Sequence, residues 1–304
     1  MPELPDVALY VEHLNRRLAG RTLERVRLAS PFLLRTVSPP LSTADGKTIR
    51  GFRRLGKRIV FELEGGPFLA VHLMTAGRFH WKDAVRAPVP KKVGLAAFDV
   101  PGSTLLLTEA SPKKRAALHV VATEEELVAL SRGGIEPLEA GLAAFAAALR
   151  AESHTVKRAL TDPRLFSGIG NAYSDEILHA ARISPFALTR KMGDAELARL
   201  FEATRWTLKS WLERLREETG DRFPEKVTAF RPDFAVHGKY GRPCPACGSP
   251  VQRLVYAANE ANYCATCQTG GRLLADRALS RLLKDDWPRT LEELEEAKAT
   301  RLEA

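Results

Sequence analysis

A cluster of four cysteines constrains this chain more than any other feature. All four fall within the 24 residues CPACGSPVQRLVYAANEANYCATC, as the pairs Cys244/Cys247 and Cys264/Cys267. In a reducing compartment, two CxxC pairs at this separation are typical of a tetrahedral zinc site and not of disulfides. The spacing therefore predicts a small module folded around one Zn²⁺. Because four thiolates leave no open coordination position, we expect this metal to be structural.

The charge balance points to a polyanionic partner. The chain has 304 residues and a formal net charge of +9, which favours nucleic acid as a first guess. It lacks an apolar run of the roughly 18 residues that a membrane span needs, and its beginning lacks the layout of a signal peptide. We therefore expect a cytoplasmic protein with no membrane partner.

Basic residues gather at two places in the first half of the chain. RGFRRLGKR runs from Arg50 to Arg58, and PKKRA contains Lys113, Lys114 and Arg115. Each cluster alone is equally consistent with a solvated charged face. Together with the zinc module and the net charge, the two clusters favour a groove that follows a phosphate backbone.

The chain begins MPELPDVALY, and part of this stretch predicts a helix start. Pro5 and Asp6 suit a first helical turn, and Val7, Val11, Leu14 and Leu18 then share one helical face. Helix initiation leaves Pro2 and Glu3 without a purpose.

The rest of the chain divides into a strand-rich part and a helical part. Residues 20 to 122 contain short alternating segments separated by Gly or Pro, which indicates a β-sandwich or barrel. From about residue 129 to 217 the pattern is helical, with one apolar face formed by Leu197, Leu200, Phe201, Leu208, Leu212 and Leu215. We predict an α+β fold with domains at 1–128, 129–235 and 236–272. A helical extension at 273–304 is expected to be two short helices broken at Pro288.

A second motif is LFSGIGNAYSDEILHAARISPF, residues 165 to 186. A Gly-x-Gly-Asn turn at a helix start exposes successive backbone N–H groups that can bind a phosphate, and Asn171 adds a side-chain donor. An ordinary helix connector is an equally good reading of the spacing alone.

Taken together, these segments resemble the formamidopyrimidine-DNA glycosylase and endonuclease VIII family of base-excision DNA repair enzymes. The resemblance spans residues 1 to about 270. It rests on the four-cysteine finger and on the segments PELPDV, LGKRIV, HLMTAGR, GIEPL and KRALTDPRLFSGIGNAYSDEIL, in this order. It implies an N-terminal helix with a β-sandwich, a helix–two-turn–helix segment and a zinc finger, with double-stranded DNA bound between the halves. It also implies a monomer associated with the nucleoid.

The resemblance assigns roles to particular residues. Removal of Met1 would leave Pro2 with a free amine as the catalytic nucleophile; an ordinary α-amine has a pKa of about 8, against about 10.4 for lysine. Glu3 would move protons to and from the opened sugar, and Lys57 would lie near the phosphate or the base. Lys157 and Asn171 match family positions that hold the DNA backbone.

The chain departs from the family at positions that handle DNA. Asp6 stands where the family usually has glutamate. Asn259 stands where the family finger has an arginine that grips the phosphates; Arg253 or Arg272 are alternatives for that contact. SPKKRA replaces DPRRFG, so the wedge that fills the space of the flipped base falls to Met74, Lys114 or Arg115. These changes leave the preferred lesion open.

Three functions are consistent with the sequence. The leading hypothesis is a bifunctional DNA glycosylase and abasic-site lyase that excises oxidised or ring-opened bases through a Pro2 iminium, followed by β- or β,δ-elimination. The alternative is a DNA-binding protein of the same fold that recognises abasic or unusual DNA without base excision. A zinc-stapled RNA-binding module has only its charge in support.

Overall fold

A computed structural model describes residues 1–225, 227, 231–256, 259–275 and 287–302. The described chain forms two compact units, Met1–Gly134 with Lys209–Ala229, and Ile135–Leu208 with Phe230–Ala304. None of the helices in these described ranges combines the length and the apolar character needed to cross a membrane. The α+β class predicted from the sequence is confirmed.

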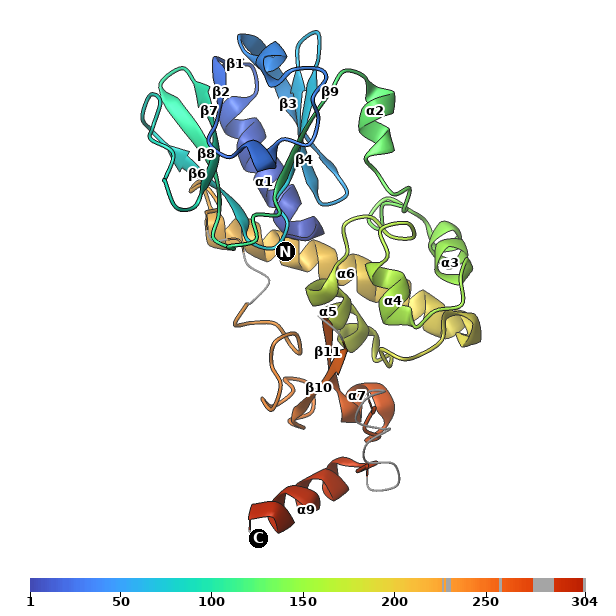
Figure 1. Ribbon diagram of the computed structural model, residues 1–304. Coiled ribbons are helices and arrows are strands. Elements are labelled where there is room, and N and C mark those ends of the chain that lie inside the picture. The colour runs from blue at the N-terminus through green and yellow to red at the C-terminus, as the bar shows by residue number, and fades with distance from the viewer. Residues whose placement is uncertain (226, 228–230, 257–258, 276–286, 303–304) are drawn as a thin grey trace. The chain divides into compact units, whose positions relative to one another are not determined.

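The first unit opens with helix α1, Leu4–Leu18. Its Val7, Leu14 and Leu18 are buried as predicted, while Val11 lies at the margin of the core. Figure 1 shows α1, in dark blue, between two antiparallel sheets. Tyr10 of this helix packs edge-on against Phe79, which in turn contacts Phe98, so that α1 and the sheets enclose one aromatic-rich core.

Strands that follow one another along the chain are divided between the two sheets. The five-stranded sheet runs β1-β3-β4-β5-β9, formed by Thr22–Leu23, Lys47–Leu55, Arg58–Leu63, Phe68–His72 and Ala117–Val121. The four-stranded sheet runs β2-β7-β8-β6, formed by Arg25–Leu28, Gly94–Val100, Ser103–Glu109 and Gly77–Lys82. Short 3₁₀ turns lie at Pro31–Leu33 and Leu41–Ala44, and helix α2 (Glu124–Ala129) follows β9.

The segment PFLAVHLMTAGRFHW is divided between the two sheets. β5 ends at His72 and β6 begins at Gly77, so the chain changes sheet over four intervening residues. Gly77 donates its N–H to the Leu73 carbonyl at 2.9 Å. A Cβ at residue 77 would lie 2.2 Å from that carbonyl oxygen, so only glycine fits this crossing.

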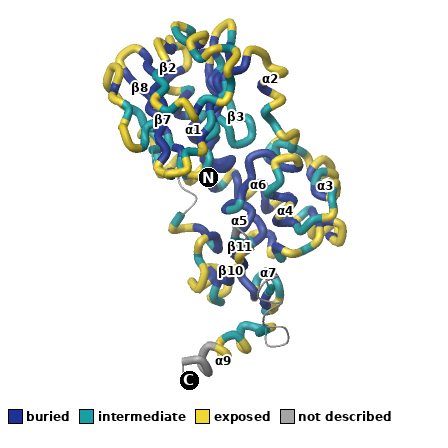
Figure 2. The backbone as a smooth tube through the Cα atoms, viewed as in Figure 1, coloured by how far each residue is buried: buried dark blue, intermediate teal, exposed yellow. Residues whose placement is uncertain are grey.

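The second unit contains the predicted helical part. Its helices are α3 (Leu142–Arg150), α4 (Val156–Thr161) and α5 (Asn171–Ala181), with a 3₁₀ turn at Thr189–Lys191. The long helix α6, Asp194–Thr219, contributes residues to both units, and the apolar face predicted for it is buried. Figure 2 shows that α5 is buried along most of its length.

The finger and the extension complete this unit. The finger is a hairpin of β10 (Val251–Tyr256) and β11 (Asn259–Cys264) followed by α7 (Ala265–Thr269). Helix α9, Leu291–Leu302, is the second helix expected after Pro288; the first falls largely at residues 276–286, outside the described residues. Leu291 and Leu294 pack against the apolar cluster that contains Leu254 and Tyr263, so the extension adds to the finger's small core.

Candidate active site and metal centre

The N-terminal residues are held by a reciprocal capping box. Glu3 is the N-cap of α1, its side chain accepts from the backbone of Asp6, and its own N–H donates to Asp6 Oδ2 at 2.9 Å. Pro2 is buried, and Glu3 and Asp6 are only 3% and 1% exposed. The helix thus begins one residue before Pro5, and Asp6 serves as the acid that orients the N-terminal turn.

Charged groups surround the N-terminal amine. Burial lowers the pKa of the Met1 amine, with Arg78 and Lys57 acting in the same direction, while the Glu3 and Asp6 carboxylates oppose the shift. Burial also lowers the pKa of Lys57, and Glu3 again opposes it. The structure therefore brings together Glu3, Lys57 and the start of the chain. Arg78, the last residue of the HLMTAGR segment, also acts on this amine, although the sequence analysis assigned it no role.

Lys57 occupies the tight turn between β3 and β4. Leu55 pairs with Arg58, and Gly56 has a φ of 61°, which suits the first position of a two-residue type II′ hairpin turn. Of the nearby basic cluster, Arg53 forms ion pairs with Glu62 and Glu124. This part of the cluster is therefore internally neutralised, as in a solvated charged face.

Met74 has a backbone conformation that is unusual for its residue type. Its φ is 52°, and its N–H donates to His72 Nδ1 at 3.0 Å. Burial, together with the positive charges of Arg58 and Lys57, lowers the pKa of His72 to about 4, so the ring is neutral near pH 7 and can accept this hydrogen bond. The predicted wedge residue Met74 is thus held by a side chain that the sequence did not single out.

The other two wedge candidates lie in a loop organised by Glu109. This carboxylate is 1% exposed, and it accepts the N–H groups of Arg115 and Ala116, each at 3.0 Å. Lys114 has a φ of 41°, and its Nζ donates to the Glu109 carbonyl. The side chain of Arg115 is exposed. Glu109 had no signal in the sequence because its partners are main-chain groups.

In the second unit the Gly-x-Gly-Asn turn starts α5, as predicted. Gly168 has a φ of 82°, Gly170 is the N-cap, and Asn171 is the first residue of the helix. Within the described residues the half-buried Asn171 side chain has no hydrogen-bond partner, so its donor group is available. Lys157 from α4 lies close to the same turn: its Nζ donates to the Asn171 carbonyl at 3.2 Å.

Lys157 is a buried residue and not a surface lysine. It is 3% exposed, and besides Asn171 its Nζ donates to Ser174 Oγ at 3.1 Å and to Asp175 Oδ1. All three ammonium hydrogens are therefore used within the protein. Asp175 also accepts from His237 Nδ1 at 2.8 Å and from Asn262 Nδ2 at 3.2 Å, so one buried carboxylate ties α4, α5 and the finger together.

The neighbouring Glu176 holds the chain that leads into the finger. It accepts three main-chain N–H groups, from Ala235, Val236 and His237, at 2.7 to 2.9 Å. Burial raises the pKa of this carboxyl, and the three donors oppose the rise. Neither Asp175 nor Glu176 was identified from the sequence, because both act through long-range contacts.

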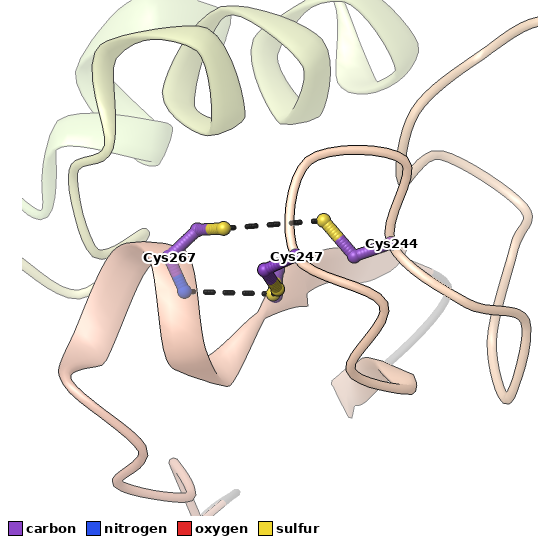
Figure 3. Close-up of side chains that lie close together, drawn as sticks. Cys244, Cys247 and Cys267 are labelled. Carbon is purple, nitrogen blue, oxygen red and sulfur yellow. Dashed lines mark hydrogen bonds between the residues drawn. The ribbon is translucent and has the colours of Figure 1, made fainter.

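The four cysteines converge on one point. Their Sγ atoms all lie within 4.8 Å of one another, with Cys244–Cys267 at 3.9 Å and Cys247–Cys264 at 3.4 Å. Figure 3 shows Cys244, Cys247 and Cys267 turned toward one another. A tetrahedral ion with Zn–S bonds of about 2.3 Å would place its sulfurs about 3.8 Å apart. The four sulfurs fit such an ion, so they form a metal site.

The thiols differ in their readiness to ionise. Burial works against ionisation of Cys247, but hydrogen bonds, chiefly from Ser249, lower its pKa to about 6. Burial raises the pKa of Cys267 to about 11, and that of Cys264 further still. Cys247 is thus the thiol of these three that ionises most readily, and all four cysteines must be deprotonated to bind a metal.

One further contact reaches the metal site from outside the finger. His179, on α5, places its Nε2 3.2 Å from Cys244 Sγ.

The finger position predicted to contact the DNA phosphates is Asn259. It begins β11, but its side chain lies outside the described residues. Arg253 lies over the Tyr240 ring at 4.8 Å, and Arg272 follows α7.

An N-terminal helix on a β-sandwich, a Gly-x-Gly-Asn helical segment and a four-cysteine hairpin define the class of helix–two-turn–helix DNA glycosylases. The protein-family model of the formamidopyrimidine-DNA glycosylase N-terminal domain matches residues 1–119 of this sequence. The family model of the formamidopyrimidine-DNA glycosylase H2TH domain matches residues 134–221. The chain belongs to the formamidopyrimidine-DNA glycosylase family.

Individual relatives agree with this assignment. Formamidopyrimidine-DNA glycosylase of Thermus thermophilus is 35% identical over 279 residues, covering 89% of this chain and 100% of that protein. An uncharacterized formamidopyrimidine-DNA glycosylase-like protein of Mycobacterium tuberculosis is 41% identical over 151 residues, 50% of this chain and 94% of that protein. The solved complex of Lactococcus lactis Fpg with DNA containing an abasic site has a TM-score of 0.77 at 23% identity, covering 88% of this chain and 99% of that chain, which shows the shared fold.

Proposed function

We propose that this protein is a bifunctional DNA glycosylase and abasic-site lyase that excises oxidised or ring-opened bases from double-stranded DNA, acting as a monomer with Pro2 as its nucleophile. One observation carries the proposal: Glu3 and Lys57 surround a buried N-terminal amine at the start of a capped helix. A nucleophilic amine with a nearby carboxylate and a nearby cation is what attack at a sugar carbon requires.

The chemistry begins at the amine. With Met1 removed, the neutral secondary amine of Pro2 attacks C1′ of the damaged nucleotide, and the bond from C1′ to the base breaks with its electron pair leaving on the base. The departing base takes up a proton from water, and the Glu3 carboxylate accepts the amine proton. Glu3 then passes this proton to O4′ as the ring bond between C1′ and O4′ opens. The product is an iminium that joins Pro2 to C1′.

The iminium then promotes strand cleavage. It acidifies the C2′ proton; a base removes this proton, the C3′–O bond breaks, and the 3′ phosphate leaves with the electron pair. A second elimination can expel the 5′ phosphate, and water finally hydrolyses the linkage to restore the Pro2 amine. We assign the proton transfers in these steps to Glu3, because it is buried beside the amine.

Burial supports the nucleophile. Burial lowers the pKa of the Met1 amine, and Pro2 is buried beside it, so we expect the Pro2 amine to be desolvated as well once Met1 is removed. A larger fraction of neutral amine is then present near pH 7. Lys57 adds a positive charge near the same point and can attract the phosphate of the nucleotide under attack.

The remaining candidate residues would position DNA. The free Asn171 donor at the N-terminus of α5 suits a phosphate, and the buried Lys157, which is paired with Asp175, would hold this turn in place through the Asn171 carbonyl. Met74, Lys114 and Arg115 are the residues we assign to the space left by the flipped base. The cost of extrusion, a few kcal/mol, is lowest for a damaged or mispaired base. The metal of the four-cysteine site is proposed to be one structural Zn²⁺.

Borohydride trapping tests this proposal. The protein, shown by intact mass to lack Met1, is incubated with duplexes that carry an abasic site, an oxidised purine or a ring-opened purine, and the iminium is reduced. We expect a covalent adduct with the abasic duplex and with at least one lesion, and none with undamaged DNA. A Pro2→Ala variant, which has a primary amine at its N-terminus once Met1 is removed, serves as the comparison for the secondary amine. Tight, salt-sensitive binding without any adduct or cleavage would favour the DNA-binding alternative instead.

A further inference from the structure

Helix α5 connects the two features of the second unit that the proposed function uses. Its first residue is Asn171, in the Gly-x-Gly-Asn turn, and its last turn carries His179, whose Nε2 lies 3.2 Å from Cys244 Sγ. Among the described residues, His179 is the one side chain outside the finger that forms a hydrogen bond with a cysteine sulfur.

We propose that His179 is a positioning residue of the metal centre: its Nε2–H donates to the Cys244 thiolate, and this hydrogen bond strengthens metal binding and joins the centre to α5. The inference rests on the proposed metal site and not on the glycosylase reaction. It concerns how this chain holds its metal, which four cysteines alone do not settle.

The chemistry of the sulfur determines the direction of the hydrogen bond. A metal-bound thiolate has no proton, so it can only accept, and the imidazole must be the donor. Four thiolates around a divalent ion leave a net charge of −2, much of it on the sulfurs. Because Cys244 is 2% exposed, water does not offset this charge there, and a donor from the protein is worth more than it would be at the surface.

The hydrogen bonds around Cys244 and at the end of α5 support a connection between the metal centre and this helix. The Cys244 N–H donates to the Ser249 carbonyl at 2.8 Å, which is a contact within the finger. Among the described residues, the hydrogen bond of Cys244 to a group outside the finger is the one with His179. A second link lies one turn away: Gln268 donates to the Ile183 carbonyl at 2.8 Å and accepts from the Cys264 N–H at 2.8 Å. The end of α5 thus contacts Cys244 directly, and Ile183, just after the helix, is linked to Cys264 through the Gln268 side chain.

Measuring zinc affinity in His179 variants shows whether this side chain acts as a hydrogen-bond donor or only fills space. His179→Leu and His179→Phe remove the donor, with a smaller and a larger apolar group, whereas His179→Gln keeps an N–H. Ala180→Ser, at the exposed neighbouring position, is the matched control. We expect the two apolar variants to lose zinc to a chelator with about 10- to 100-fold lower apparent affinity, while His179→Gln and the control stay close to the wild type.

Spectroscopy supplies a second readout that does not involve DNA. In Co²⁺-substituted protein, loss of the donor should move the thiolate-to-metal charge-transfer band to lower energy, because the Cys244 sulfur becomes more electron-rich. In ¹¹³Cd-substituted wild-type protein, the His179 Nε2–H should show scalar coupling to the metal through the sulfur, which needs no variant to fold. Unchanged zinc affinity and cobalt spectrum in a folded apolar variant, or absence of that coupling, would overturn the proposal whatever the glycosylase activity.

Discussion

The main-chain N–H of Glu3 donates a hydrogen bond to Asp6 Oδ2 at 2.9 Å, and both residues are almost fully buried. The acid three residues into the helix thus fixes the backbone of the residue that we assign to proton transfer. Because Pro2 is bonded directly to Glu3, the same contact limits where the Pro2 amine can lie.

Replacing Asp6 is therefore expected to affect both stability and chemistry. Asp6→Ala leaves the buried Glu3 N–H without an acceptor, which should cost about 1 to 2 kcal/mol of unfolding free energy. The yield of borohydride-trapped adduct should fall as well. Asp6→Asn keeps an acceptor oxygen and should lie close to the wild type in both measurements. Equal trapping by all three proteins would show that this cap does not position the nucleophile.

Glu109 is expected to control the loop that carries the wedge candidates. In Glu109→Ala the N–H groups of Arg115 and Ala116 lose their acceptor, at a cost of about 1 to 3 kcal/mol for each group that stays buried. Urea unfolding should record this loss, and affinity for a duplex with an abasic site should fall with it. Glu64→Gln, on an exposed residue of the same domain, is the control that should change neither. Normal stability in Glu109→Ala would contradict the role assigned to this carboxylate.

Asp175 is expected to matter more for stability than any surface acid. It is 1% exposed and accepts from Lys157 and His237, so Asp175→Ala would leave a buried ammonium without its partner. Breaking a buried ion pair from one side typically costs about 3 to 5 kcal/mol. Denaturant unfolding of the variant should show a loss in this range. A loss below about 1 kcal/mol, comparable with a surface ion pair, would mean that the pair is not buried in solution.

The lowered pKa of His72 makes the stability of the folded protein depend on pH, with a sign that can be worked out. Its pKa is about 4 in the folded protein, below the ordinary value of 6.5, so between these values the unfolded chain binds more protons. Stability must therefore fall as the pH drops from 7 to 5, by about 1 to 2 kcal/mol from this residue.

The variant His72→Asn isolates this contribution. Asparagine offers an acceptor oxygen to the Met74 N–H but does not titrate, so the fall in unfolding free energy between pH 7 and pH 5 should be smaller by about 1 to 2 kcal/mol. Chemical denaturation at both pH values measures the difference. The same pH dependence in both proteins would contradict a neutral, buried His72.

Features that depend on local spacing were predictable from the sequence. The cysteine pairs, the face of α6 and the start of α1 follow from periodicity and residue type, which act over a few residues. The contacts of Glu109, Asp175 and His179 were not predictable in the same way. Each depends on a partner brought close only by the fold; His179 and Cys244, for example, are 65 residues apart.

The C-terminal extension illustrates the same limit. The sequence indicated a helix after Pro288, and α9 confirms it, but nothing in its pattern indicated that Leu291 and Leu294 pack on the finger. The change of sheet at Gly77 was equally hidden, because PFLAVHLMTAGRFHW has apolar residues on both sides of the crossing.

The most direct test of the central claim is to locate the covalent bond. Protein that lacks Met1 is trapped with borohydride on a duplex that carries an abasic site, digested with trypsin and nuclease, and mapped by mass spectrometry. The account predicts that the sugar remnant lies on the peptide Pro2–Arg16, with fragment ions that place it on the Pro2 nitrogen. A remnant on Lys57 or on any other lysine, with Pro2 unmodified, would contradict the assignment of Pro2 as the nucleophile.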